Sequence, residues 1–303
     1  CEAAEGFPVH FDRAAYEADH VLVCGRIKPH TRFVGEIESG LMKMMLIGLG
    51  KHAGATVYHQ AIQDFSFGQI VRSVAREVLS RGGVLAGLAI VEDAFDETAK
   101  IVGVQPEEFE SQESKLLRLA REWMPRLPFP QADLLLIDEI GKNISGTGLD
   151  TNVVGRKYLD HVAREDESPK IRFIAIRGLA ATSYGNATGI GLSEFCRSRV
   201  LRDMDVRATR INCLTGGHLT AAMLPLDYET DREILETALA GIGLTDPSDS
   251  RLMWIQNTLR LTELECSEHF WDDARGRTDL EILTEPRKLP FGEDGNLPNS
   301  VGQ

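Results

Sequence analysis

The sequence has 303 residues, enough for two domains, and its 43% apolar and 26% charged residues are ordinary for a soluble globular protein. Its 33 basic and 46 acidic residues give a net charge of −13, which argues against the nonspecific phosphate attraction on which nucleic-acid binding depends. Its five cysteines form no C-x-x-C pair, which disfavours a disulfide framework and a cysteine-only zinc site, and no apolar run reaches the roughly 18 residues that span a bilayer.

The first third of the chain alternates strand-like and helix-like patterns. The apolar run at residues 20–27 predicts a buried strand, in which Cys24 would be a small core residue. A loop carrying His30 follows, and residues 41–55 then predict a helical stretch that ends in glycines. Apolar residues at helical spacing predict an amphipathic helix at 70–81. The next predicted elements are a strand at 84–93, a short strand at 100–104 and a helix at 112–124.

Three prolines within residues 125–130 predict a linker, because proline resists helix and sheet interiors. Beyond it we predict strands at 132–140 and 171–179, a glycine-rich loop at 141–156, further mixed α/β segments at 187–201, 202–214 and 232–243, and a last strand at 278–286. Strands alternating with helices predict an α/β fold with mostly parallel sheets. We expect two mixed α/β domains, residues 1–128 and 129–303, with a cleft between them, and the last strand could return to either domain.

Residues 26–59 concentrate the reactive side chains. His30, Lys43 and His59 are set among glycines beyond a strand, a common way to present chemistry at the mouth of an α/β sheet. His30 follows a proline in a restricted loop and suits proton transfer near neutral pH, although a surface role is also open. The backbone N–H groups after Ser39 and Gly40 can form an anion-binding nest at a helix start, and an ordinary capped helix beginning at Ser39 is the alternative. A lone histidine such as His59 is more often structural than a metal ligand.

Several familiar motifs are missing from the sequence. It contains no P-loop, no complete G-x-G-x-x-G after a strand, no H-E-x-x-H and no G-x-S-x-G. A P-loop nucleotide hydrolase, a zinc site with three local ligands and a serine nucleophile are therefore disfavoured.

The run from Ala18 to His59 resembles the cofactor-binding domain of the nickel-dependent lactate racemase family. The matching features, in chain order, are Ala18-Asp19, His30, Phe33-x-Gly35, Ser39-Gly40, Lys43 and His59. The resemblance covers residues 8 to about 110 and continues more loosely through the second domain. The family's upstream D-x-T-R element and its G-T-H motif, which bears a second base, have no match here. The resemblance implies one of two arrangements for this N-terminal part. Either the chain is a fragment and an earlier segment carries that part, or a partner chain carries it.

The family uses a nickel pincer nucleotide, a pyridinium mononucleotide in which two sulfurs and a ring carbon hold nickel. The resemblance implies that Lys43 is linked to the cofactor's thioacyl group, that Ser39 and Gly40 contact the cofactor, and that His59 supplies the remaining nickel ligand. His30 would be one of two bases that exchange the hydroxyl proton of a small 2-hydroxy acid, whose Cα hydride passes to the pyridinium ring and returns to either face. The implied activity is racemisation or epimerisation, with cofactor biosynthesis enzymes as partners.

Binding of the substrate carboxylate needs the planar guanidinium group of an arginine or the ammonium group of a lysine. Lys142 and Arg156 in the glycine-rich loop are the candidates, and the alternative is that they are ordinary solvated surface charges. Glu36 and Glu38, which depart from the family pattern, are expected to alter which substrate enters.

Two other functions stay open, namely a noncatalytic anion- or nucleotide-binding module and a metal-dependent hydrolase or dehydrogenase on the same scaffold. The acidic N-terminal segment lacks the apolar core of a signal peptide, so we expect a cytoplasmic protein without membrane or nucleic-acid partners. A homo-oligomer also stays open.

Overall fold

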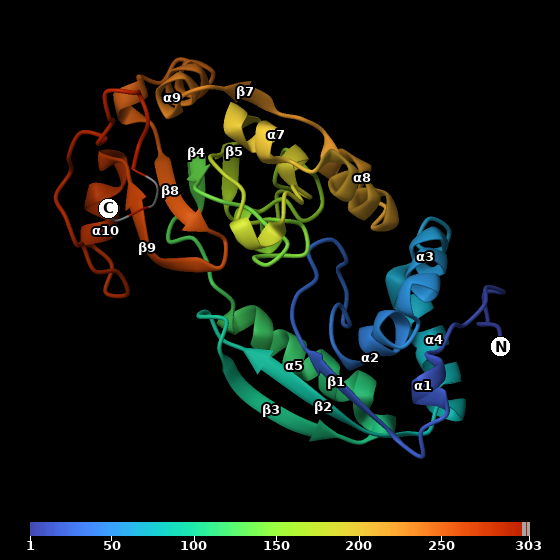
Figure 1. Cartoon of the computed structure of the whole chain (residues 1–303). Helices are drawn as coiled ribbons and strands as arrows, with labels where there is room; N and C mark the ends of the chain where they lie inside the picture. The colour runs from blue at the N-terminus through green and yellow to red at the C-terminus, as the bar shows by residue number, and fades with distance from the viewer. Residues whose placement is uncertain (299–300, 302–303) are drawn as a thin grey trace. The chain divides into compact units, whose positions relative to one another are not determined.

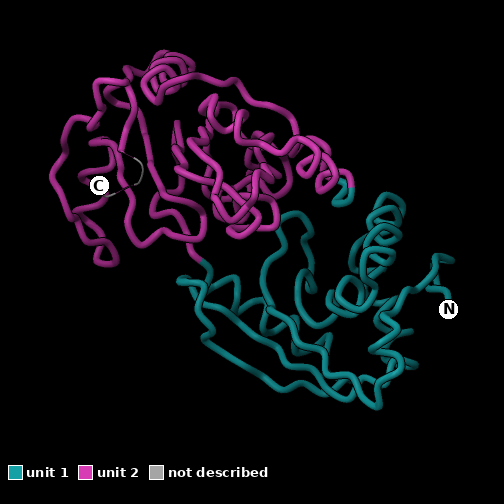
Figure 2. The backbone as a smooth tube through the Cα atoms, in the orientation of Figure 1, with its two compact units in different colours: residues 1–124, 215–217 teal, residues 125–214, 218–303 magenta. Residues whose placement is uncertain are grey.

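A computed structural model of the chain describes residues 1–298 and 301, and the chain divides into two compact units (Figures 1 and 2). Unit 1 consists of Cys1–Met124 with the short stretch Thr215–Gly217, and unit 2 of Pro125–Leu214 with His218–Gln303. The division falls where the proline-rich segment begins. The interdomain cleft stays a prediction.

Unit 1 is a three-stranded sheet with helices on one side (Figure 1). Its elements are α1 (Arg13–Tyr16), β1 (Val21–Arg26), α2 (Leu41–Lys43), the π-helical turn η1 (Met44–Gly48), α3 (Lys51–Ala61), α4 (Phe67–Arg81), β2 (Val84–Glu92), β3 (Thr98–Val104), the 3₁₀ turn η2 (Pro106–Glu108) and α5 (Phe109–Trp123). Ser66 begins α4 with a capping box, in which its side chain accepts from Gln69 N and the Gln69 side chain accepts from Ser66 N.

The strand order in unit 1 is β1-β2-β3, with β1 parallel to β2 and β2 antiparallel to β3. Val21 and Val23 of β1 are buried in a core that includes residues of α2, α4 and α5. Side chains alternate along a strand, so Leu22 and Cys24 point to the other face, and both are exposed. The expectation that Cys24 is a core residue is therefore wrong, because only one face of this sheet is covered.

Unit 2 is built around a six-stranded sheet with the order β7-β6-β5-β4-β8-β9. Its strands and α-helices are β4 (Gln131–Ile137), α6 (Thr151–Val154), β5 (Lys170–Ile176), β6 (Phe195–Arg197), α7 (Ser198–Asp203), α8 (Val206–Thr215), β7 (Leu226–Tyr228), α9 (Asp231–Ala240), β8 (Leu252–Asn257), β9 (Arg260–Cys266) and α10 (Trp271–Arg275). Its 3₁₀ turns are η3 (Ala181–Ser183), η4 (Ile190–Leu192), η5 (Leu219–Ala222), η6 (Pro247–Asp249) and η7 (Glu268–Phe270).

All neighbouring strands of this sheet are parallel except β8 and β9. The central strand β4 is buried from its second residue to its last, which explains its uninterrupted apolar run. Helix α9 contacts β4, β6 and β7, and its Ile234 packs with Leu134 and Trp254 in the core. The carboxyl ends of the parallel strands meet at one edge of the sheet, where ligands of α/β folds commonly bind.

The α/β class is as predicted, and the mostly parallel sheet is that of unit 2. The predicted strands at 20–27, 84–93, 132–140 and 171–179 and the helices at 70–81 and 112–124 are confirmed within a few residues at their ends. The last strand predicted at 278–286 is wrong, because these residues form no helix or strand and lie in unit 2. Among the described residues, none of the helices combines the length and apolarity needed to traverse a lipid bilayer.

Candidate functional site

The loop between β1 and α2 is organised by Glu38, whose side chain is completely buried. Its Oε2 accepts a hydrogen bond from His30 N at 2.7 Å, and its Oε1 accepts from Gly35 N at 3.2 Å and from Arg121 Nη2 at 2.6 Å. Arg121 also donates to the carbonyl of Gly35 at 2.9 Å. A buried carboxylate is tolerable only when paired and hydrogen-bonded in this way. Glu38 therefore fixes the course of the loop, while Glu36 lies on the surface, 3.5 Å from Arg72.

His30 is half-buried and held in one orientation by this loop. Its Nδ1 accepts hydrogen bonds from the backbone N–H groups of Arg32 at 3.1 Å and Phe33 at 3.2 Å. Its ring stacks on Phe33, with centroids 4.3 Å apart, and Phe33 stacks on Phe67 at 4.5 Å. An Nδ1 that accepts two donors carries no proton, so the neutral ring bears its proton on Nε2. Proton exchange with a bound molecule would therefore use Nε2.

Lys43 ends α2, and the chain continues without a break into the π-helical turn η1. Turns of this kind are rare and are frequently found at functional sites. The α-helical pattern resumes in α3, and His59 lies in the last turn of this helix. Both Lys43 and His59 are half-buried.

Burial, followed by the positive charge of Lys43, lowers the pKa of His59 below its ordinary 6.5. The charge of Lys43 therefore acts on the imidazole of His59. The lowered pKa keeps His59 neutral near pH 7, with a lone pair available for a metal ion or a proton.

Glu113 of α5 also belongs to this cluster, and the sequence analysis missed it. Its side chain is 1% exposed, and its Oε2 accepts a hydrogen bond from Met42 N at 2.8 Å. Burial raises the pKa of Glu113 to about 7, although hydrogen bonds from the N–H groups of Met42 and Leu41 and the charge of Lys43 oppose the rise. Its other oxygen, Oε1, is buried without a hydrogen-bond partner. Glu113 therefore holds the start of α2 one residue before Lys43.

Gly40 allows this close approach of Glu113. It is the N-cap of α2 and makes no side-chain cap, so the helix does not begin at Ser39 as the alternative reading expected. A Cβ atom on Gly40 would lie 2.6 Å from the carboxyl carbon of Glu113 and 2.3 Å from Cδ1 of Ile27. The N–H groups of the predicted anion nest thus bind a carboxylate of the chain itself. Cofactor contacts by Ser39 and Gly40 stay predictions.

The two residues predicted to bind the substrate carboxylate lie in unit 2. Lys142 is exposed, and its Nζ donates to the carbonyl of Gly146 at 2.7 Å. Arg156 is 1% exposed, pairs with Glu194 at 2.9 Å and donates to the carbonyl of Leu192. This arrangement of Arg156 is typical of a structural ion pair and does not support substrate binding. The contact predicted for Lys142 stays a prediction.

Comparisons with known proteins leave the family of the chain undetermined. No family model and no curated protein matches it. Among solved structures, the chain is similar to the lactate racemase apoprotein from Thermoanaerobacterium thermosaccharolyticum, at 14% identity and a TM-score of 0.47, over 86% of this chain and 66% of that one. The chain thus spans about two thirds of the length of that structure. A likeness at this level assigns neither a family nor an activity.

Proposed function

We propose that the chain is a racemase or epimerase of a small 2-hydroxy acid, and that Lys43 and His59 hold its nickel pincer nucleotide. The observation that supports this most is the coupling of Lys43 to a half-buried His59 whose pKa is lowered. Covalent attachment of a thioacyl group needs an amine, and nickel ligation needs a neutral imidazole. The two groups lie on consecutive helical segments, joined by a π-helical turn.

The donor set also fits a metal that is held mainly by its cofactor. Among the described residues there is no group of three or more His, Cys, Asp or Glu side chains that could hold a metal ion. A zinc ion held by the protein takes three or four such ligands. A single imidazole from His59 suits a nickel ion whose other donors belong to the nucleotide.

In this proposal each side chain has a defined task. When bound, the cofactor would supply the hydride-accepting chemistry that the protein lacks. His30 would take the hydroxyl proton of the substrate at Nε2 and return it, while the two N–H donors at Nδ1 keep the ring in place. Glu113 would act as a positioning residue, because it fixes the start of α2 directly before Lys43.

The noncatalytic receptor hypothesis is less well supported. It uses the N–H groups at the start of α2 to bind an anion or a nucleotide phosphate. The N–H groups of Leu41 and Met42 already bind the carboxylate of Glu113. We therefore favour an enzyme whose cofactor is attached through Lys43.

The test is co-expression with the cofactor biosynthesis enzymes, followed by intact-mass analysis and nickel quantification. We expect a covalent adduct of the nucleotide's mass and about one nickel per chain. Lys43→Ala should abolish the adduct, and Lys51→Ala, at an exposed lysine on the next helix, should retain it. His59→Ala should keep the adduct and lose most of the nickel. His30→Ala should keep both and slow exchange of the substrate's configuration by about 10²- to 10⁴-fold.

An unmodified Lys43 under these conditions would contradict the proposal. A loaded protein that leaves the configuration of every 2-hydroxy acid unchanged would favour the receptor instead. The exchange is best followed with substrate deuterated at Cα, because a catalyst scrambles the configuration of the deuterated centre.

A further inference from the structure

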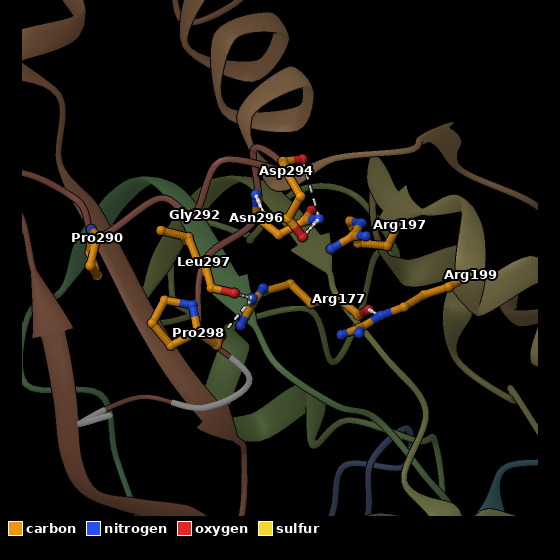
Figure 3. Close-up of a pocket in the computed structure, with 9 residues that line it drawn as sticks. All are labelled: Arg177, Arg197, Arg199, Pro290, Gly292, Asp294, Asn296, Leu297 and Pro298. Carbon is orange, nitrogen blue, oxygen red and sulfur yellow. Dashed lines mark hydrogen bonds between the residues drawn. The ribbon is translucent and has the colours of Figure 1, made fainter.

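Unit 2 contains a pocket of about 360 Å³ at the carboxyl edge of its parallel strands, which we call the arginine pocket (Figure 3). Its volume lies in the range of small-molecule sites. Arg177 directly follows β5, Arg197 ends β6, and Arg199 lies in the first turn of α7. Figure 3 shows these three arginines on one side of the pocket, with Pro290 on the opposite side.

Arg177 is held within the fold by the two Nη groups of its guanidinium, while its Nε is buried without a hydrogen-bond partner. Its guanidinium pairs with Asp138 and donates to Asp231 at 2.7 Å and to the carbonyls of Leu297 and Pro298 at 3.0 and 2.8 Å. Its side chain is only 1% exposed. Arg177 therefore ties the C-terminal segment to the sheet and gives the pocket a rigid floor.

Among the described residues, Arg197 and Arg199 each have guanidinium N–H groups that donate no hydrogen bond. The Arg197 side chain is 9% exposed, its Nη1 lies 3.3 Å from Asp231, and its Nε is buried without a hydrogen-bond partner. Arg199 uses its Nε to donate to the carbonyl of Arg177 at 2.6 Å. Within the described part of the chain, Arg199 forms no ion pair. Burial and the charges of Arg197 and Arg177 lower the pKa of Arg199, so an anion beside it would be stabilising.

The charges around the pocket select the kind of anion. Arg177 pairs with the buried carboxylates of Asp138 and Asp231, and Arg197 pairs with Asp231. An exposed carboxylate, Asp294, lies at the rim, where it accepts hydrogen bonds from Asn296. The three carboxylates balance the three guanidinium groups, so the pocket suits a monoanion better than a dianion such as hydrogen phosphate, which the rim carboxylate repels more strongly.

We propose that the arginine pocket binds a small monocarboxylate through the guanidinium groups of Arg197 and Arg199. The planar fork of arginine matches the two oxygens of a carboxylate. The proposal rests on residues of unit 2 alone and does not depend on the function proposed for the cluster around Lys43.

The probe is trifluoroacetate, whose binding to the full-length chain is followed by ¹⁹F NMR line broadening at constant ionic strength. We expect saturable binding with a dissociation constant of roughly 1 mM. Arg199→Gln should weaken binding about tenfold. Arg199→Lys should weaken it less, because the positive charge remains although the planar guanidinium fork is lost. Arg202→Gln is the matched control, since this exposed arginine of α7 pairs with Glu229 outside the pocket. Asp294→Asn should tighten binding about threefold, because it removes a repelling charge and keeps an oxygen for Asn296.

Competition identifies the ligand class. Acetate should displace the probe, and inorganic phosphate at the same concentration should not. Stronger displacement by phosphate would overturn the assignment to a monocarboxylate. Absence of saturable binding, or equal affinity in the wild type, Arg199→Gln and Asp294→Asn, would overturn the site itself. If Lys43 carried no adduct in the co-expression experiment, these expected outcomes would be unchanged. Each of the two proposals can therefore be refuted independently of the other.

Discussion

Replacing Glu113 by Gln tests whether a buried carboxyl group fixes the start of α2. Glutamine keeps the shape of the side chain and an oxygen that can accept from Met42 N, but it removes the ionisable group. Its NH₂ group would take the place of Oε1, which is buried without a hydrogen-bond partner. The substitution therefore removes the cost of a buried charge and adds the smaller cost of an unpaired amide donor.

The magnitude follows from the pKa of Glu113, which burial raises from 4.5 to about 7. Above pH 7 the group is ionised in both the folded and the unfolded chain, and the burial penalty applies in full. Below pH 4.5 it is protonated in both, and no penalty applies. Between these values the folded chain keeps a proton that the unfolded chain has lost, so the free energy of unfolding falls as pH rises. At about 1.4 kcal/mol per pH unit, the full difference is about 3 kcal/mol.

The assay is amide hydrogen exchange of α5 and α2 at pH 5, 6, 7 and 8, corrected for the intrinsic pH dependence of exchange. It reports the opening free energy of unit 1 without requiring both units to unfold together. We expect the opening free energy of the wild type to fall by about 2–3 kcal/mol relative to that of Glu113→Gln between pH 5 and pH 8. Glu122→Gln, at an exposed position of the same helix, should follow the wild type. If the opening free energies of Glu113→Gln and the wild type changed in parallel with pH, the reasoning would be refuted, because Glu113 would then titrate as a solvated carboxyl group.

Three further substitutions have defined outcomes. Gly40→Ala should destabilise unit 1 by about 1–3 kcal/mol in the same exchange assay, because its Cβ would come within 2.3 Å of a neighbouring side chain. NMR titration should give His59 a pKa below 6.5, and Lys43→Met should raise it only part of the way, because burial is the larger cause. Arg156→Met should destabilise unit 2 by about 3 kcal/mol in denaturant unfolding, because Glu194 loses its bidentate partner.

Each of these substitutions has a control or a contradicting result. Gly103→Ala places a Cβ in open space and should leave the stability of unit 1 nearly unchanged. Lys115→Met, at an exposed lysine of α5, should not move the pKa of His59. An Arg156→Met protein of wild-type stability that had lost affinity for 2-hydroxy acids would show that Arg156 binds substrate after all.

The sequence predicted the elements of the fold wherever an apolar pattern repeats over many residues. The helix at 70–81 and the strand at 132–140 are of this kind, and both lie where the pattern places them. The segment at 278–286 also contains apolar residues, but Leu283 is 63% exposed and the segment forms no strand. A strand needs a partner for its backbone, and local sequence does not say whether an edge of a sheet is free. Two strands that were not predicted, β8 and β9, extend the sheet of unit 2 beyond β4.

The candidate site shows the same division between local and distant information. His30, Lys43 and His59 were predicted together because they lie in one stretch, and the charge of Lys43 adds to burial in lowering the pKa of His59. Glu113 had a signal of its own, since it occupies the apolar face of α5 between Phe109 and Leu116, where an acid is out of place. That signal marks a buried carboxyl group, but it does not name what the group binds. The partner is the N–H of Met42, 71 residues away in the chain, and only the packing of α5 on α2 brings the two together.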